Sequence, residues 1–190
     1  VLLTFITAMQ VPNGSGGATP QSELHVLKRS GDHAPLSFDK VALRIQRLSY
    51  GLAADVKTVA VAQQVIAGLY DKVTTAEIDQ QAARVAASMT IDHPDYGVLA
   101  ARLELGQMHR DTPKLFSELA RRLRNHCCAS TGRAMPLVSA ELIDVVDAHT
   151  DRIDGALVHE RDMGLSHFGL STLKRSYLLK IDGKSVETPQ

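Results

Sequence analysis

Residues 25–40 constrain the fold of this chain more than any other stretch. They predict a strand, a tight turn around Gly31 and a second short strand, followed by a helix that begins near Phe38. Gly31 suits the turn because glycine adopts positive φ at no steric cost. Lys28 and Arg29 place two cations at the end of the first strand. Because a helix N-terminus presents unpaired N–H groups, these cations and the helix together predict a binding site for a phosphate chain.

The composition predicts a globular chain with an aliphatic core and gives no support to a broad nucleic-acid-binding surface. Hydrophobic residues make up 44% of the 190-residue chain, which is enough for a core. That core must be aliphatic, because aromatic residues make up only 4%. The 21 basic and 21 acidic residues give a net charge of +0, so no nucleic-acid partner is expected.

The cysteines and histidines follow no metal or disulfide pattern. Cys127 and Cys128 are adjacent, and neighbouring residues rarely bridge each other, so no disulfide framework is predicted. A reducing compartment fits this usage better than a secreted one. The eight histidines lack metal-ligand spacing, so no metal site is predicted. Residues 126–128, His-Cys-Cys, are expected to be loop, and a soft-metal site is the alternative interpretation.

The N-terminal residues predict a flexible segment rather than a membrane span. The apolar residues 1–9 are fewer than the roughly 20 that a spanning helix needs, and they lack the signature of a secretory signal. Residues 11–21 are rich in Gly, Ser and Pro. Residues 1–22 are therefore expected to be a flexible leader and linker, with membrane contact only through residues 1–9. We expect a cytoplasmic protein, or an organellar one if a targeting segment was removed before Val1.

Apolar residues at helical spacing predict a series of helices after residue 37. The predicted ranges are 38–50, 58–70, 75–89, 95–109 and 113–123, followed by 138–146 and 151–162. Thr74 and Glu77 have capping-box spacing at the start of the third helix. Val59 is assigned to the apolar stripe of the second helix, and Leu115 to that of the fifth. Residues 177–186 predict a β-hairpin, because Asp-Gly stands between two short strand-like runs.

A set of short motifs between residues 28 and 102 points to a known family. The motifs are Lys28-Arg29-Ser30-Gly31, Phe38-Asp39-Lys40, Gly68-Leu69-Tyr70, Val73-Thr74-Thr75, Glu77-Ile78-Asp79, His93-Pro94-Asp95-Tyr96 and Ala100-Ala101-Arg102. In this order and spacing, the set closely resembles the N-terminal ATP-cone of the class I ribonucleotide reductase large subunit of the eukaryotic type. The resemblance continues more thinly through residues 161–181, toward the lead-in to that enzyme's catalytic barrel, whereas residues 124–164 match poorly.

The resemblance implies a mainly α, α+β fold in three parts. Residues 1–22 are the leader, and residues 23–123 form a small β-hairpin that caps a four- to five-helix ATP-cone bundle. Residues 124–190 form a helical extension with the terminal hairpin. The resemblance also implies an allosteric site for ATP or dATP, with Mg²⁺ as an accompanying ion. Carried over residue by residue, the nucleotide contacts fall on Lys28, Arg29, Phe38, Asp39, Lys40, Thr75, Asp79 and Arg110.

The chemistry of these residues agrees with that role. The cations can neutralise a triphosphate. Thr75 and Asp79 are four apart, so they share one helix face, and Asp79 could accept a hydrogen bond from a ribose hydroxyl. The sequence also departs from the family pattern. Ala34-Pro35 replaces charged or polar residues, and Arg110 stands where a Lys is usual.

The resemblance also bears on activity and partners. The sequence stops at Gln190, where the barrel with its redox cysteines would begin, so these 190 residues are not expected to reduce ribonucleotides. The implied partners are other large subunits and the small radical-bearing subunit. The alternative is a non-catalytic accessory or structural subunit, derived from an ATP-cone and bound to unrelated subunits of a larger assembly. A cone-containing transcriptional repressor is disfavoured, because the sequence has no Cys-x-x-Cys.

Overall fold

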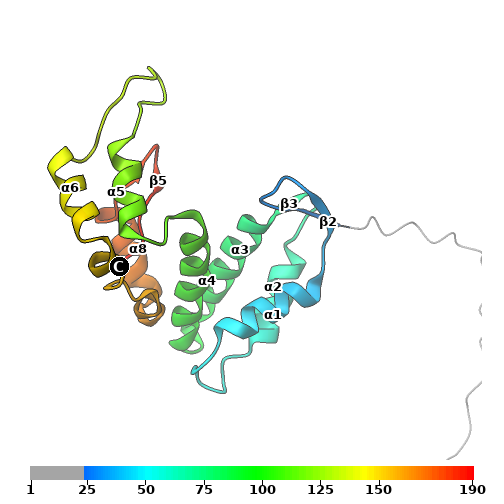
Figure 1. Ribbon diagram of the computed structural model, residues 1–190. Helices are drawn as coiled ribbons and strands as arrows, with labels where there is room; N and C mark the ends of the chain where they lie inside the picture. Colours follow the sequence, from blue (N-terminus) through cyan, green and yellow to red (C-terminus); the bar gives the residue numbers. More distant parts are fainter. Residues whose placement is uncertain (1–23) are drawn as a thin grey trace, which may run out of the picture.

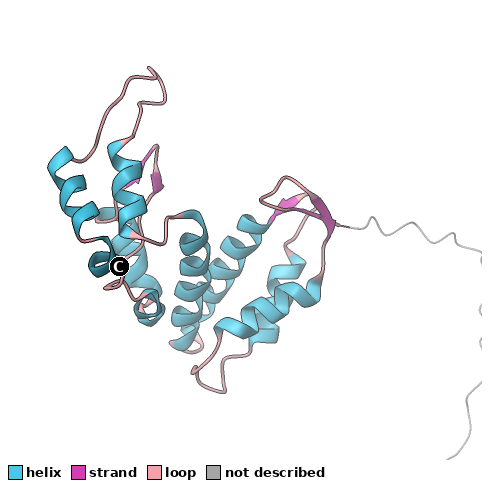
Figure 2. Ribbon diagram, viewed as in Figure 1, coloured by secondary structure: helices cyan, strands magenta, loops and turns pink. Residues whose placement is uncertain are grey.

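A computed structural model describes residues 24–190, and the predicted leader and linker lie outside the described residues. The first part comprises a small sheet and the helices up to α4, and the second part comprises α5 and everything after it (Figure 1). Helices dominate both parts, and the strands are short (Figure 2). The predicted mainly α, α+β class is confirmed.

The predicted hairpin is present, and its two strands belong to a three-stranded sheet. β1 (His25–Leu27) pairs antiparallel with β2 (His33–Pro35), and it pairs parallel with β3 (Val73–Thr74) on its other side. Gly31 adopts φ +86°, and the Lys28 N–H closes the turn by donating to the Asp32 carbonyl at 2.9 Å. The parallel strand β3 was not predicted from the sequence, because two residues carry too little pattern.

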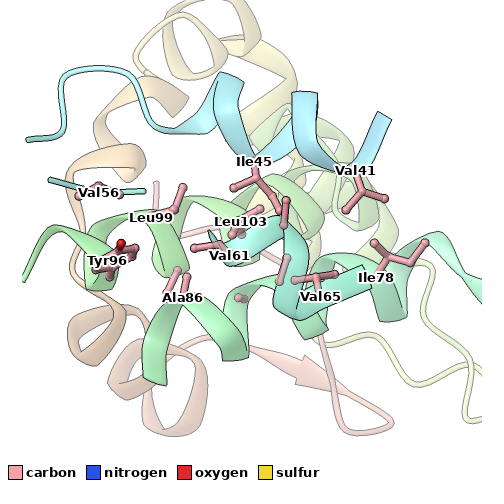
Figure 3. Close-up of a cluster of buried hydrophobic side chains, with 14 of the residues drawn as sticks. Val41, Ile45, Val56, Val61, Val65, Ile78, Ala86, Tyr96, Leu99 and Leu103 are labelled. Atoms are coloured by element: carbon pink, nitrogen blue, oxygen red, sulfur yellow. The ribbon is translucent and has the colours of Figure 1, made fainter. Parts of the chain in front are cut away.

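Four helices pack beside this sheet around one aliphatic core. They are α1 (Phe38–Leu48), α2 (Thr58–Ala67), α3 (Thr75–Ser88) and α4 (Asp95–Asp111), and the short 3₁₀ helix η1 (Met89–Ile91) links the last two. Figure 3 shows side chains from all four helices meeting in this core. Val61, Val65, Leu99 and Leu103 are fully buried in this core.

Two side-chain placements from the sequence are wrong. Val59 lies on the outside of α2 and is 66% exposed, whereas Val61 is fully buried. On an α-helix, these two positions differ by about 200° around the axis, so they cannot face the same core. Leu115 is 41% exposed because α5 (Phe116–Arg124) begins one residue later, which leaves Leu115 in the connecting segment.

The second part contains three further helices and the terminal hairpin. The helices are α6 (Ala140–Ala148), α7 (Thr150–Asp154) and α8 (His167–Ser176), and β4 (Lys180–Ile181) pairs with β5 (Lys184–Ser185). The predicted hairpin is confirmed, with positive φ at both Asp182 and Gly183, as in a type I′ turn. α5 makes its principal contacts with α6 and α7, so its packing groups it with residues 124–190.

The single helix predicted over residues 151–162 is wrong. α7 ends at Asp154, Gly155 follows as its C-cap, and a separate 3₁₀ helix, η2, runs over His159–Gly164. Glycine is a poor helix former, and the Asp154 carboxylate accepts hydrogen bonds from the Ser117 N–H at 2.9 Å and hydroxyl at 2.6 Å. The end of α7 is thereby tied to the start of α5.

Helix α4 is shared by both parts. One face carries Leu99 and Leu103 in the first core, and another packs Ala101 and Leu105 against Leu170 of α8. Arg102, on the same helix between these two faces, is also buried. Its guanidinium donates to the carbonyls of Leu48, Tyr50 and Met163 at 2.9, 2.6 and 3.2 Å. Because these three carbonyls belong to both parts, Arg102 fixes the end of α1 to the segment that precedes α8.

Every helix within residues 24–190 falls short of the length and apolar character needed to cross a bilayer.

Candidate functional site

A cavity of about 510 Å³ lies beneath the β-hairpin. Its walls come from β1 and β2, the first turns of α1 and α3, and the last turn of α4. In Figure 1, β2 and β3 lie at one end of the helical bundle, beside the start of α3. Val26, Leu36, Val41 and Ile78 supply apolar surface. A volume of this size suits a small-molecule ligand.

Cations surround this apolar surface on several sides. Five basic side chains line the cavity: Lys28, Arg29, Lys40, Arg44 and Arg110. They come from the hairpin turn, from α1 and from α4, so only the folded chain brings them together. Arg29 also pairs with Asp111 at 3.1 Å, which links the hairpin turn to the end of α4. Positive charge gathered in a concave site favours an anionic ligand.

A buried carboxylate holds two of the arginines in place. Asp79 on α3 is 4% exposed, and its two oxygens accept from Arg44 Nε and Arg110 Nη2. Arg44 Nη2 is buried and has no hydrogen-bond partner among residues 24–190, so it retains a donor for another group. Burial, reinforced by the charge of Arg44, lowers the pKa of Arg110, although Asp79 opposes this shift.

Gly106 on α4 leaves room for these two guanidiniums. A Cβ at this position would meet Arg44 Nη2 at 3.4 Å and Arg110 Nη1 at 3.9 Å. The arginines therefore approach the α4 backbone closely, and a larger side chain here would displace them.

Local sequence signals fix the two helix N-termini at the cavity. Thr74 and Glu77 form the predicted capping box, in which Thr74 Oγ1 accepts from the Glu77 N–H at 3.1 Å and Glu77 Oε2 accepts from the Thr74 N–H at 2.8 Å. The hydrogen bond from the Thr74 N–H is the main cause that lowers the pKa of Glu77, and the hydrogen bond from the Thr74 hydroxyl lowers it further. Ser37 is the N-cap of α1 and also lines the cavity. Thr75, the first residue of α3, lines the cavity as well.

The structure brings most of the predicted site residues together. Six of the eight line the one cavity: Lys28, Arg29, Lys40, Thr75, Asp79 and Arg110. Phe38 and Asp39 are exposed in the first turn of α1 and do not contribute to its lining. Whether these eight residues contact a nucleotide stays a prediction. Asp79 is also less free to reach a ligand than the sequence suggested, because both of its oxygens already pair with arginines.

Sequence reasoning missed Arg44. The signal was present, because Arg44 is one helical turn after Lys40 and therefore shares its face of α1. Ala34 and Pro35, where the sequence departs from the family pattern, also line the cavity. They present apolar surface where the family pattern has charged or polar residues.

Comparison with known proteins agrees with this architecture. The model of the ATP cone domain family matches residues 24–111, which end where α4 ends. The ribonucleoside-diphosphate reductase large subunits of Danio rerio and Caenorhabditis elegans are 45% and 46% identical to the chain over 168 and 167 residues. The large chain of Schizosaccharomyces pombe is 44% identical over 168 residues.

These alignments cover nearly all of the chain but only part of each relative. They take in 87–88% of this chain and 21% of each of the three relatives. The chain thus spans about a fifth of the length of these proteins. An alignment of 168 residues within 190 extends well past residue 111, so the similarity continues into the second part. Residues 24–111 therefore match the ATP cone domain family, within a longer stretch that is similar to ribonucleoside-diphosphate reductase large subunits.

Proposed function

We propose that the cavity beneath the hairpin binds the triphosphate and sugar of ATP or dATP, and that the domain is an allosteric regulator of a ribonucleoside-diphosphate reductase large subunit. The observation that carries the proposal is the set of five basic side chains around one cavity of about 510 Å³. A triphosphate presents several anionic oxygens, and arginine donors match them in bidentate geometry. The domain family and the relatives supply the nucleotide class and the context.

The lining suggests how each part of the nucleotide is held. Lys28, Arg29 and Lys40 lie at the hairpin and the first turn of α1, where the phosphates would also meet the helix dipole. The apolar surface of Val26 and Pro35 suits the faces of a purine ring. Asp79 is the one carboxylate among the described lining residues, and two arginines engage it. An accompanying Mg²⁺ would therefore be held by phosphates and water.

Helix α4 gives the site a physical connection to the rest of the chain. Arg110 contributes to the cavity from the last turn of α4, and the same helix packs against α8. A ligand that favours one position of Arg110 would therefore bias a helix that both parts share. We propose that this bias controls how the chain associates with other large subunits and with a small subunit.

Equilibrium binding of ATP and dATP to the 190-residue chain tests the proposal. Arg44→Ala and Lys28→Ala should each weaken binding about tenfold or more, because each removes a charge-assisted contact. Arg47→Ala and Lys57→Ala are matched controls, since both side chains are exposed and neither lines the cavity. At 100 times its Kd, a ligand should stabilise the fold by about 2.7 kcal/mol, which a melting curve detects.

The outcomes separate the alternatives. Binding that the two cavity variants lose and the two controls keep supports the proposal. A well-folded wild-type chain that binds neither nucleotide would refute it, and would favour the accessory-subunit interpretation. Sedimentation in ATP and in dATP then tests regulation, because an allosteric domain should give different assemblies with the two ligands.

A further inference from the structure

A second cluster of chemistry-bearing side chains lies at the junction of the two parts, apart from the nucleotide cavity. His109 belongs to the last turn of α4, and His159 and Asp162 belong to η2. One ligand-type atom from each of the three side chains lies within 4.8 Å of the other two. His109 Nε2 is 2.8 Å from Asp162 Oδ2, and the two imidazole centroids are 5.3 Å apart.

The hydrogen bonds leave two acceptor atoms unused. His159 Nε2 is 2.8 Å from the Lys114 carbonyl, which can only accept, so Nε2 carries the proton and Nδ1 carries a lone pair. That Nδ1 atom is buried and has no partner among residues 24–190. Asp162 is 1% exposed, and its Oδ1 is likewise buried and unpartnered within this range. Unpaired buried acceptors are costly, so a group that satisfies them would stabilise this site.

The backbone explains why the three side chains converge. A 3₁₀ helix has three residues per turn, so His159 and Asp162, three apart on η2, project from the same side. α4 presents His109 to that side, and contacts between α4 and η2 hold the two elements together. The α4 C-terminus also carries the negative end of the helix dipole, which favours a cation nearby.

The spacing suits a small metal ion. Bonds of 2.0–2.1 Å at a tetrahedral angle separate neighbouring ligand atoms by about 3.3 Å. One ligand atom from each of the three side chains lies within 4.8 Å of the other two, and His109 Nε2 is 2.8 Å from Asp162 Oδ2. Side-chain movements of up to about 1.5 Å would bring the atoms to the tetrahedral separation.

We propose that His109, His159 and Asp162 bind one divalent transition-metal ion, with Zn²⁺ as the best match. Two imidazoles and one carboxylate are ligands that zinc and its neighbours accept, whereas Mg²⁺ and Ca²⁺ prefer oxygen alone. The Lys114 carbonyl orients His159 from the far side of its ring, as outer hydrogen bonds do in zinc sites. The ion joins α4 to η2 and leaves a fourth position for water.

Zinc titration of the metal-free chain against a chromogenic chelator tests the site. Cys127 and Cys128 are free, so the titration uses a Cys127→Ser, Cys128→Ser background that removes competing thiolates. We expect one zinc per chain and a rise in melting temperature on binding. His159→Gln and Asp162→Asn should each weaken binding at least about tenfold. His149→Gln and Asp151→Asn, both at exposed positions, should leave it unchanged.

Cobalt substitution provides a second measurement that does not depend on the variants folding. Co²⁺ bound by nitrogen and oxygen alone shows weak visible bands without a thiolate charge-transfer band. A folded wild-type chain that shows a thiolate band, and a cysteine-free chain that binds no metal, would place the ion at Cys127 and Cys128 and overturn the proposal. Stoichiometric binding that persists in both ligand variants would overturn it as well.

Discussion

Replacing Asp79 with Asn tests the part of the site that depends most on three-dimensional structure. The Asp79 side chain is 6% exposed and accepts from Arg44 and Arg110 at once. Asn keeps the shape but turns one acceptor into an NH₂ donor, which then faces a guanidinium donor. The substitution also removes the negative charge that holds two arginines close together, so their repulsion is no longer offset.

The magnitude follows from the burial of the three partners. Removing one member of a buried ion pair costs about 3–5 kcal/mol, and a fully exposed pair contributes about 0–1 kcal/mol. Asp79 is buried, but Arg44 and Arg110 are 36% and 37% exposed, so water screens part of the penalty. We therefore expect Asp79→Asn to lower the free energy of unfolding by about 2 kcal/mol.

Urea unfolding measures this change. Far-UV circular dichroism and tyrosine fluorescence should give coincident transitions, which justifies two-state treatment. With a slope of about 2 kcal/mol/M, the midpoint should fall by about 1 M. Asp111→Asn is the matched control, because Asp111 is 49% exposed and its partner Arg29 is 38% exposed. This ion pair should contribute under about 1 kcal/mol to the free energy of unfolding. If the two variants lose the same small amount, the buried triad does not stabilise the fold as argued.

Three further predictions concern the fold. Thr74→Ala removes one half of the capping box and should lower the free energy of unfolding by about 1 kcal/mol in the same urea assay. Leu103→Ala in α4 should lower the free energy of unfolding by about 2–5 kcal/mol, because Leu103 is fully buried. Val59→Ala in α2 should lower it by under about 0.5 kcal/mol, because Val59 is 66% exposed, and equal losses would contradict this outward placement of Val59. Hydrogen bonds from Thr74 lower the pKa of Glu77 in the folded chain. The contribution of Glu77 to the free energy of unfolding is therefore complete above its unfolded pKa of about 4.3, and it is lost as the pH falls through its folded pKa. Glu77→Gln should flatten this acid limb of a profile of stability against pH.

Local features of the fold could be predicted because their signals lie within a few residues. The turn at Gly31 needs a positive φ, and the hairpin at Asp182-Gly183 needs two in succession. The capping box of Thr74 and Glu77 is likewise set by spacing alone. These features appear in the structure where the sequence placed them.

Features that join distant elements could not be predicted in the same way. Arg44, Asp79 and Arg110 come from three helices, and no spacing in the sequence reports that two arginines share one carboxylate. The prediction that no metal site exists rested on histidine spacing. His109 and His159 are far apart in the chain, so that argument could not detect their approach in the fold.

The packing of the second part illustrates the same limit. α5 has a regular apolar face, but periodicity does not say which neighbour covers it. The resemblance places α5 within residues 23–123, and that boundary stays a prediction. In the structure its principal contacts are with α6 and α7, two elements that follow it in the chain.

Amide signals of the isotope-labelled chain decide whether the cavity beneath the hairpin is the nucleotide site. On addition of ATP, the signals that move most should belong to the hairpin turn around Gly31, the first turns of α1 and α3, and the last turn of α4. Signals in α6 and in the β4–β5 hairpin should stay in place. Saturable shifts confined to those latter segments, or no shifts in a folded chain at millimolar ATP, would contradict the claim.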